Sequence, residues 1–204
     1  MHMRKSLWML FFLAIATFIF QCSSGNNKDA GNLKSETTPR SNNGGQSNSA
    51  GGLTWQAPSA WKIGQPQQMR VVTYIIPAET GNADNAECAV FHFPGTGGDK
   101  ESNLQRWASQ FEQPDGRNSA DVAIIKEMES NALKITTIDL NGIYKVTGGP
   151  MMEVRDKKLG YALKGAIIEG PQGPVFFKMV GPEKTVKASG DRFSAMIKSA
   201  KAGA

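Results

Sequence analysis

Cys22 is the residue of this 204-residue chain whose chemistry the sequence indicates most directly. It follows an apolar run, Leu7 to Phe20, which is preceded by the basic residues Arg4 and Lys5. A basic start followed by a short apolar run is the pattern of a secretory signal. The thiol of a cysteine in this place can take a diacylglyceryl group, and the amine freed by cleavage can take a further acyl chain. Each buried methylene contributes about 0.8 kcal/mol, so several chains would hold the protein firmly at a membrane.

The apolar run is too short to span a bilayer, because a spanning helix needs about 20 apolar residues. The residues around Cys22 resemble the lipobox of bacterial lipoproteins, with two departures. The box prefers Gly, Ala or Ser where this chain has Gln21, and Phe20 is bulkier than usual. An ordinary signal would also need small residues at this point. We therefore expect a lipoprotein signal peptide over residues 1–21 and lipidation at Cys22. The alternatives are an uncleaved anchor and an ordinary signal with an incidental cysteine.

The residues that follow form a polar segment, which we expect to be a disordered tether over residues 22–52. Its only apolar side chains apart from the cysteine are those of Ala30, Leu33 and Ala50. A segment of this composition cannot bury enough surface to offset the entropy lost on ordering. A flexible coil of about 30 residues spans roughly 30 Å, which would let a domain clear the lipid headgroups.

The expected location is the bacterial cell envelope, and the expected partners are a membrane, through the N-terminal lipid, and an envelope protein that the sequence does not identify. Ser23 stands where an aspartate retains lipoproteins at the inner membrane of enterobacteria, which favours the outer membrane. The net charge is +5, and removal of residues 1–21 would leave about +3. Because Lys and Arg are scattered along the chain, nothing indicates a nucleic-acid partner.

Residues 53–201 are enough for one domain with its own core, followed by a tail at 202–204. With Cys22 committed to lipid, Cys88 has no disulfide partner within the chain, and we expect it to be a buried structural thiol. A reactive thiol would need exposure and a nearby base. His92 would lie on the same strand face but about 13 Å away. The two residues therefore do not form a nucleophile and base pair.

The Gly-rich segment Gly95–Lys100 precedes a predicted helix, an arrangement that can bind phosphate. It lacks the Gly-x₄-Gly-Lys-Ser/Thr spacing, and Glu101 follows the lysine, so we interpret it as a plain strand-to-helix turn. A capping box at Ser102–Gln105 predicts the start of the helix. Its apolar stripe consists of Leu104, Trp107, Ala108 and Phe111.

Most of the remaining domain has strand patterns, in runs bounded by turn residues. The predicted strands are Met69–Ile76, Ala86–Phe93, Ala123–Glu129, Leu133–Leu140, Tyr161–Glu169 and Pro174–Val180, forming antiparallel pairs in that order. Asn141-Gly142 predicts either a further hairpin or a bulge in one long strand. We interpret Thr147–Leu159 as a loop. Pro182 is expected to begin a C-terminal helix that contains Gly190.

Several short motifs occur in a characteristic order along these elements. They are Trp55…Pro58…Trp61, Phe93-Pro94-Gly95, Asn103…Arg106-Trp107, Leu140-Asn141-Gly142, Gly165-Ala166-Ile167 and Phe176 to Pro182. The pattern resembles a family of uncharacterised bacterial secreted proteins and lipoproteins, distantly similar to PsbP-like and Ran-binding Mog folds. The resemblance covers Leu53 to Lys201. It implies an α+β fold in which a mainly antiparallel sheet is flanked by helices as an α/β/α sandwich. It brings no catalytic residues, and the assembly roles of PsbP-like proteins favour a non-enzymatic function by analogy.

The predicted function is a membrane-anchored binding or interaction module. No HExxH, CxxC, Gly-x-Ser-x-Gly or Asp-x-Asp-x-Asp-Gly motif occurs, so the sequence assigns no catalytic residue, metal ligand or cofactor. Two alternatives remain open: a structural envelope protein without a specific ligand, and a hydrolytic enzyme whose carboxylates converge only in space. Two buried carboxylates in one cleft, or His92 beside an acid, would favour the enzyme.

Overall fold

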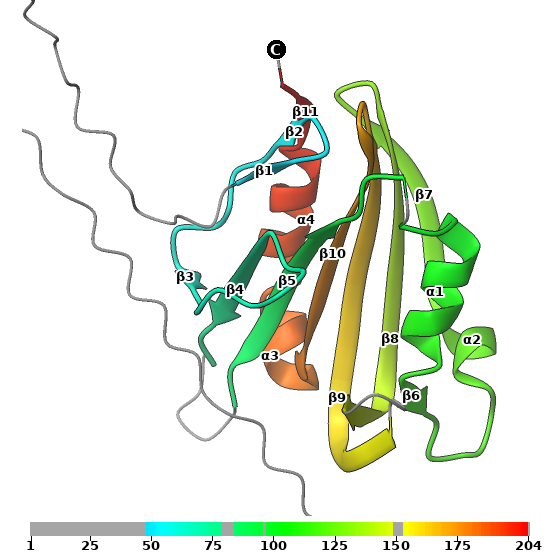
Figure 1. Ribbon diagram of the computed structural model, residues 1–204. Coiled ribbons are helices and arrows are strands. Elements are labelled where there is room, and N and C mark those ends of the chain that lie inside the picture. Colours follow the sequence, from blue (N-terminus) through cyan, green and yellow to red (C-terminus); the bar gives the residue numbers. More distant parts are fainter. Residues whose placement is uncertain (1–47, 79–83, 96, 149–152, 204) are drawn as a thin grey trace, which may run out of the picture. The chain divides into compact units, whose positions relative to one another are not determined.

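An antiparallel sheet of eight strands forms the centre of the computed structural model, which describes residues 48–78, 84–95, 97–148 and 153–203 (Figure 1). Cys22, the signal segment and most of the expected tether lie outside these residues. The strand order is β3 (Lys62–Ile63), β4 (Val72–Ile76), β5 (Ala86–His92), β10 (Gly173–Pro182), β9 (Glu153–Gly170), β8 (Leu133–Gly148) and β6 (Phe111–Glu112), and β7 (Ile124–Ser130) also pairs with β8. The fold is of the expected α+β class.

The predicted strand pairs β4–β5, β7–β8 and β9–β10 are all confirmed as antiparallel neighbours. Asn141-Gly142 does not form a hairpin, because β8 continues through it with a register shift between Gly142 and Tyr144. Gly142 has a φ of 152°, and a Cβ there would lie 2.6 Å from the carbonyl oxygen of Glu112. Glycine at this position therefore allows β6 to approach β8.

The interpretation of Thr147–Leu159 as a loop is wrong for most of that segment. Strand β8 runs on to Gly148, and β9 begins at Glu153. The first eight residues of β9 are all exposed. Because both faces of the hairpin meet solvent there, the sequence shows no apolar alternation that would predict a strand.

A second, small sheet joins the two ends of the described chain. Its strands are β1 (Ser49–Ala50), β2 (Leu53–Thr54) and β11 (Lys201–Ala202), with β2 in the centre. Gly51 and Gly52, with φ values of 60° and 73°, make the turn between β1 and β2. Regular structure therefore begins before Leu53 and includes the first residue of the expected tail.

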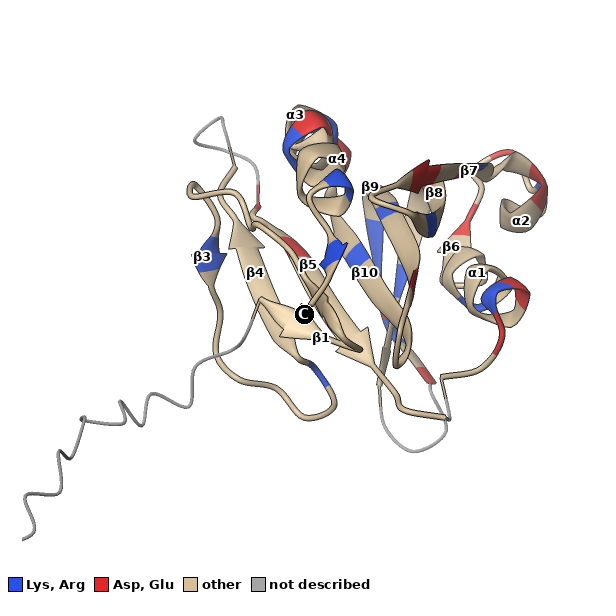
Figure 2. Cartoon of the chain, turned by 90° about the horizontal axis from the view of Figure 1, so that it is seen from above, with Lys and Arg blue, Asp and Glu red and all other residues tan. Residues whose placement is uncertain are grey.

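Helices α3 (Glu183–Ala188) and α4 (Gly190–Lys198) cover one face of the central sheet (Figures 1 and 2). The single predicted C-terminal helix is thus interrupted at Ser189, immediately before Gly190. The core on this face includes Tyr74, Cys88, Phe177, Met179, Phe193 and Ile197. Within the described residues, no helix is both long and apolar enough to cross a membrane.

Helices α1 (Lys100–Ala108) and α2 (Ser119–Val122) belong to the opposite face. The α1 stripe predicted from the sequence is confirmed for Leu104, Trp107 and Ala108, which are buried there. Phe111 is buried in the same core but belongs to β6, because the helix ends at Ala108. Trp107 packs directly over the strands, and a Cβ at Gly165 would lie 2.6 Å from its ring. The helix covers β8, β9 and part of β10, and leaves side chains of β5 half-exposed.

Candidate functional site

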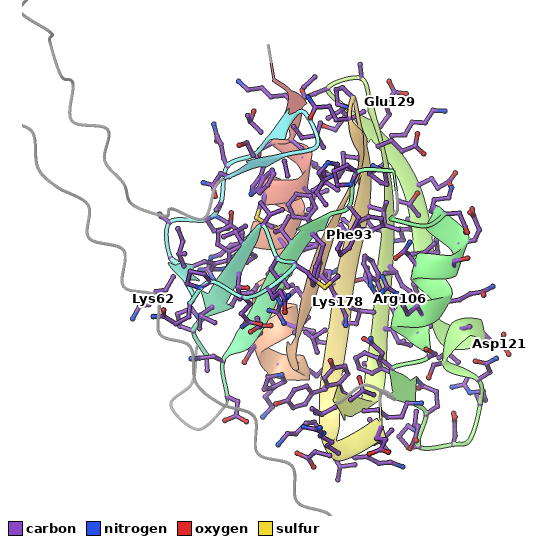
Figure 3. All side chains as sticks on the ribbon, viewed as in Figure 1. Lys62, Phe93, Arg106, Asp121, Glu129 and Lys178 are labelled. Carbon is purple, nitrogen blue, oxygen red and sulfur yellow. The ribbon has the colours of Figure 1, made fainter. Side chains whose placement is uncertain are left out.

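Three cationic side chains gather on the α1 face of the sheet, beside the part that the helix leaves uncovered. Arg70 comes from the residues before β4, Arg106 from α1 and Lys178 from β10. Electrostatic repulsion from both arginines acts on Lys178, and Glu87 of β5 is the carboxylate that opposes it. Figure 3 shows Lys178 and Arg106 close together, with Phe93 nearby. We call Arg70, Glu87, Arg106, Gln110 and Lys178, together with the hollow beside Arg106 that is described below, the basic groove.

Successive side chains of β10 point to opposite faces of the sheet, and this alternation places Lys178 on the α1 face. Its neighbours in the strand, Phe177 and Met179, are buried in the core on the opposite face. Phe176, two residues before the lysine, contacts Trp107 edge to face, with ring centroids 6.4 Å apart. A lysine therefore occupies a position where the pattern of the strand would allow an apolar core residue.

Lys178 lies in a half-buried setting where its charge is poorly compensated. Its Nζ donates a hydrogen bond to Oε1 of Gln110, which is neutral. The same Nζ lies 5.7 Å from the centroid of the Tyr144 ring, a weakly attractive cation–π contact. Burial, together with repulsion from Arg106 and Arg70, lowers the pKa of Lys178 to about 8 against the opposing attraction of Glu87.

Arg70 already has a carboxylate partner. Its Nη1 lies 2.5 Å from Oε1 of Glu87 and 3.2 Å from Oγ1 of Thr73. Its guanidinium also lies 5.7 Å from the centroid of the Phe91 ring. Arg70 therefore largely neutralises the charge of Glu87, so Glu87 attracts Arg106 and Lys178 only weakly.

Arg106 is exposed and donates a hydrogen bond from Nη2 to Oδ1 of Asn103. Asn103 in turn donates from Nδ2 to the carbonyl oxygens of Gly97 and Asp99, each at 2.8 Å. This amide thus connects the guanidinium to the turn before α1. Among the described side chains, no carboxylate oxygen lies within 4 Å of Arg106 or Lys178.

A hollow of about 390 Å³ adjoins Arg106. Its lining residues are Met69, Phe93, Gly97, Gly98, Ser102, Asn103 and Arg106. The first four give an apolar side, and the last three, all from α1, give a polar side. Arg106 lines this hollow and Lys178 adds positive potential from β10. Such an arrangement can hold an anion, since perturbed charges concentrate at functional sites.

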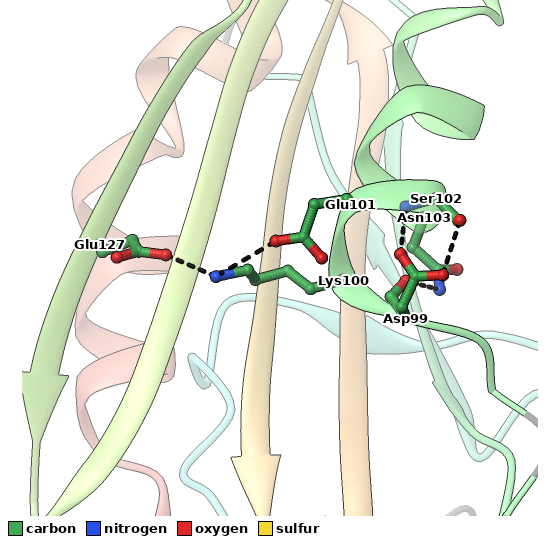
Figure 4. Close-up of polar contacts among 6 residues, drawn as sticks. All are labelled: Asp99, Lys100, Glu101, Ser102, Asn103 and Glu127. Carbon is green, nitrogen blue, oxygen red and sulfur yellow. Dashed lines mark hydrogen bonds and ion pairs between the residues drawn. The ribbon is translucent and has the colours of Figure 1, made fainter.

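The N-terminus of α1 does not form the anion site (Figure 4). Asp99 caps the helix, and its carboxylate accepts hydrogen bonds at 2.7 Å from the backbone nitrogen and the hydroxyl of Ser102. These bonds lower the pKa of Asp99, so a negative charge already occupies this helix end. The predicted plain turn is confirmed, whereas the capping box at Ser102–Gln105 is wrong, since the helix begins at Lys100.

Lys100 differs from Lys178 in having carboxylate partners. Its Nζ lies 2.5 Å from Glu127 of β7 and 3.6 Å from Glu101 (Figure 4). Hydrogen bonding to Glu127 raises the pKa of Lys100. The lysine of the Gly-rich segment is thus part of the contact between α1 and β7.

The other residues considered from the sequence lie away from the basic groove. Cys88 is fully buried in the core on the opposite face, where burial raises the pKa of its thiol, so the expectation of a structural thiol is confirmed. The Nδ1 atom of His92 lies 3.2 Å from the carbonyl oxygen of Pro174. No cluster of three His, Cys, Asp or Glu side chains that could hold a metal occurs in the part of the chain that the structure describes.

Sequence reasoning did not identify Arg70, Arg106 and Lys178 as a site. They are separated by 36 and 72 positions, and only the sheet order and the packing of α1 on the sheet bring them together. One signal was present: Lys178 interrupts the apolar run of β10. Arg106 also occurs in one of the motifs that carry the family resemblance.

No protein-family model and no curated protein matches the chain. Several solved structures are similar, and three of them each have a TM-score of 0.42. A Pseudomonas aeruginosa protein of unknown function is 12% identical, and the match covers 72% of this chain and 94% of that one. LpqN of Mycobacterium tuberculosis, described as involved in cell envelope biogenesis, is 6% identical, and the match covers 73% of this chain and 82% of LpqN. The PsbP protein of the cyanobacterium Synechocystis, from the fold group that the motifs resemble, is 10% identical, and the match covers 76% of this chain and 88% of that one.

Proposed function

We propose that this chain is a lipid-anchored protein of the bacterial cell envelope that binds an anionic ligand in the basic groove and does not transform it. The observation that carries the binding proposal is the pair Arg106 and Lys178. The two cations repel each other, and Glu87, the carboxylate that attracts Lys178, forms an ion pair with Arg70. Such an arrangement costs folding free energy, and a bound anion would offset that cost.

Binding without chemistry is supported by the kinds of groups that the groove contains. Guanidinium, ammonium and amide groups donate hydrogen bonds to an anion and orient it. The thiol of Cys88 is enclosed on the other face of the sheet and stays protonated because burial raises its pKa. The imidazole of His92 lies beside a backbone carbonyl of β10.

Anion binding is tested by thermal unfolding of the full chain with increasing inorganic phosphate, at constant ionic strength set with chloride. A ligand that binds only the folded state raises the midpoint by mass action. Phosphate should therefore raise the midpoint of the natural chain. Arg106→Gln should remove that rise, and Arg117→Gln, at an exposed arginine paired with Asp115, should retain it. Equal midpoint shifts in all three proteins would exclude the groove as the binding site.

The anchor is proposed from the N-terminal sequence, with the outer membrane favoured by Ser23. Cells expressing the chain should incorporate a palmitate analogue into it, and Cys22→Ser should abolish the labelling. Equal labelling of the two proteins would show that Cys22 is not the acylated residue. This result would leave the binding proposal unaffected, since the groove lies within the described residues.

A further inference from the structure

The hollow beside Arg106 is larger than a single inorganic anion requires. Its volume of about 390 Å³ lies within the range of about 300–1,000 Å³ that is usual for small-molecule sites. An ion that contacted only the guanidinium would leave most of this space unfilled. The hollow therefore has room for a ligand that has a body as well as a charge.

The side of the hollow away from α1 is apolar and begins at Met69, whose side chain is 69% exposed. Met69 has a φ of 66°, a left-handed conformation that is uncommon for a residue with a side chain. A flexible thioether side chain at the rim can adapt to apolar groups of different shape.

Phe93 provides a firmer part of the same apolar side. Its ring stacks on Phe91 at 6.1 Å between centroids and lies 6.4 Å from Phe176, which belongs to the core under α1. The ring is half-buried and lines the hollow. A fixed aromatic surface beside an exposed methionine suits a ligand with an apolar chain or ring.

The opposite side, on α1, leaves Arg106 as the group that can receive a charge. Ser102 donates its hydroxyl to Asp99, and Asn103 donates its amide to two backbone carbonyls. Arg106 has five N–H donors, of which the structure uses Nη2 toward Asn103. Asn103 is therefore a positioning residue for the guanidinium, and Lys178 adds positive potential beside it.

We infer that the ligand is a single-headed amphiphile, with one phosphate or carboxylate group at Arg106 and an apolar body against Met69 and Phe93. This inference rests on the proposed function, since it names the class of anion that the groove takes. It predicts that the apolar body and the charged group contribute separately to affinity, each through its own side of the hollow.

The test is titration calorimetry on the full chain with octyl phosphate, octanoate, inorganic phosphate and octyl glucoside, all below micelle formation. Octyl phosphate or octanoate should bind at least ten times more tightly than inorganic phosphate, and octyl glucoside should bind at least ten times more weakly than the better octyl anion. Met69→Ser should weaken binding of the octyl anion about threefold or more and leave inorganic phosphate unchanged. Met128→Ser, at an exposed methionine of β7, is the matched control and should change neither.

The outcomes separate the two proposals. If inorganic phosphate and both octyl anions bind equally, and all depend on Arg106, the groove binds simple anions and the amphiphile inference is overturned. If octyl glucoside binds as tightly as the octyl anions, charge has no role and the inference also fails. If Arg106→Gln abolishes the binding of none of the probes, both the amphiphile inference and the proposed function fail.

Discussion

Lys164 and Lys178 stand on adjacent strands of the central sheet and face opposite sides of it. Lys164 of β9 is directly opposite Asp139 of β8, and the two side chains form an ion pair on the side of α4. Lys178 of β10 is also half-buried, but its partner is the neutral amide of Gln110, with Arg106 on the same side. One face of the sheet thus supplies its lysine with a carboxylate, and the other face does not.

We interpret the ammonium group of Lys164 as one that stabilises the fold and that of Lys178 as one that contributes to binding. An ion pair across two strands stabilises their register. A half-buried ammonium facing other cations lowers stability, and natural proteins keep such groups mainly where function requires them. Both faces have a buried core, but of these two lysines only Lys178, on the partly uncovered α1 face, lacks a carboxylate partner among the described residues, and this is the side where we place ligand binding.

The largest expected effect concerns the helix that forms one side of the groove. Trp107→Ala should lower the free energy of unfolding by about 3–5 kcal/mol, because the ring is buried against Phe176 and over Gly165. Urea denaturation measures the change. An unchanged midpoint would mean that α1 is not packed on the sheet as described, and the difference between the two faces would disappear.

Removing the carboxylate from the α4 face should make Lys164 resemble Lys178. Asp139→Ala should cost about 1 kcal/mol, a value suited to a pair that is partly exposed. Asp121→Ala, at an exposed carboxylate on α2, is the control and should change stability by less than about 0.5 kcal/mol. Equal effects of the two substitutions in urea denaturation would show that the Asp139–Lys164 pair contributes nothing to the fold.

The pH dependence should differ between the two lysines, because the pKa of Lys178 in the folded protein is lowered to about 8. Above that pH the folded protein binds fewer protons at this site than the unfolded chain, so the contribution of Lys178 to stability rises with pH until the unfolded pKa near 10.4 is passed. We would measure the free energy of unfolding of the natural chain and of Lys178→Met between pH 7.5 and 9.5. It should rise with pH in this way only in the natural chain. Parallel curves would contradict the lowered pKa.

The same titration should weaken anion binding. Raising the pH through about 8 neutralises Lys178, whereas the guanidinium of Arg106 keeps its charge. The affinity of the full chain for octyl phosphate should therefore fall between pH 7 and 9, and the fall should be smaller in Lys178→Met. An identical fall in both proteins would show that another group causes it.

The sequence predicted the elements that are rich in apolar residues and bounded by turn residues. Strands β4, β5, β7 and β10, the second half of β9 and the stripe of α1 have such local patterns, and β7 has one although nearly all of its residues are exposed. The hairpin of β8 and β9 was missed beyond Thr147 because it is polar on both faces. The start of α1 was misplaced because Asp99, rather than Ser102, accepts the capping hydrogen bond.

The basic groove could not be predicted in the same way, because it depends on contacts between distant parts of the chain. Lys178 meets Gln110 across 68 positions, and nothing in either local segment specifies the other. Local pattern does place a charged residue in the apolar strand β10. The sheet order, with β10 between β5 and β9, places this lysine near the other residues of the basic groove.

The most direct test of the distinction between the two faces is the free energy of unfolding of Lys164→Met and Lys178→Met at pH 7. Methionine has nearly the same length as lysine and no charge, so each substitution removes one ammonium group. We expect opposite signs: Lys164→Met should lower stability because Asp139 loses its partner, and Lys178→Met should raise it by about 0.5–1 kcal/mol because an uncompensated charge is removed. A loss of stability in both variants would contradict the assignment of Lys178 to ligand binding.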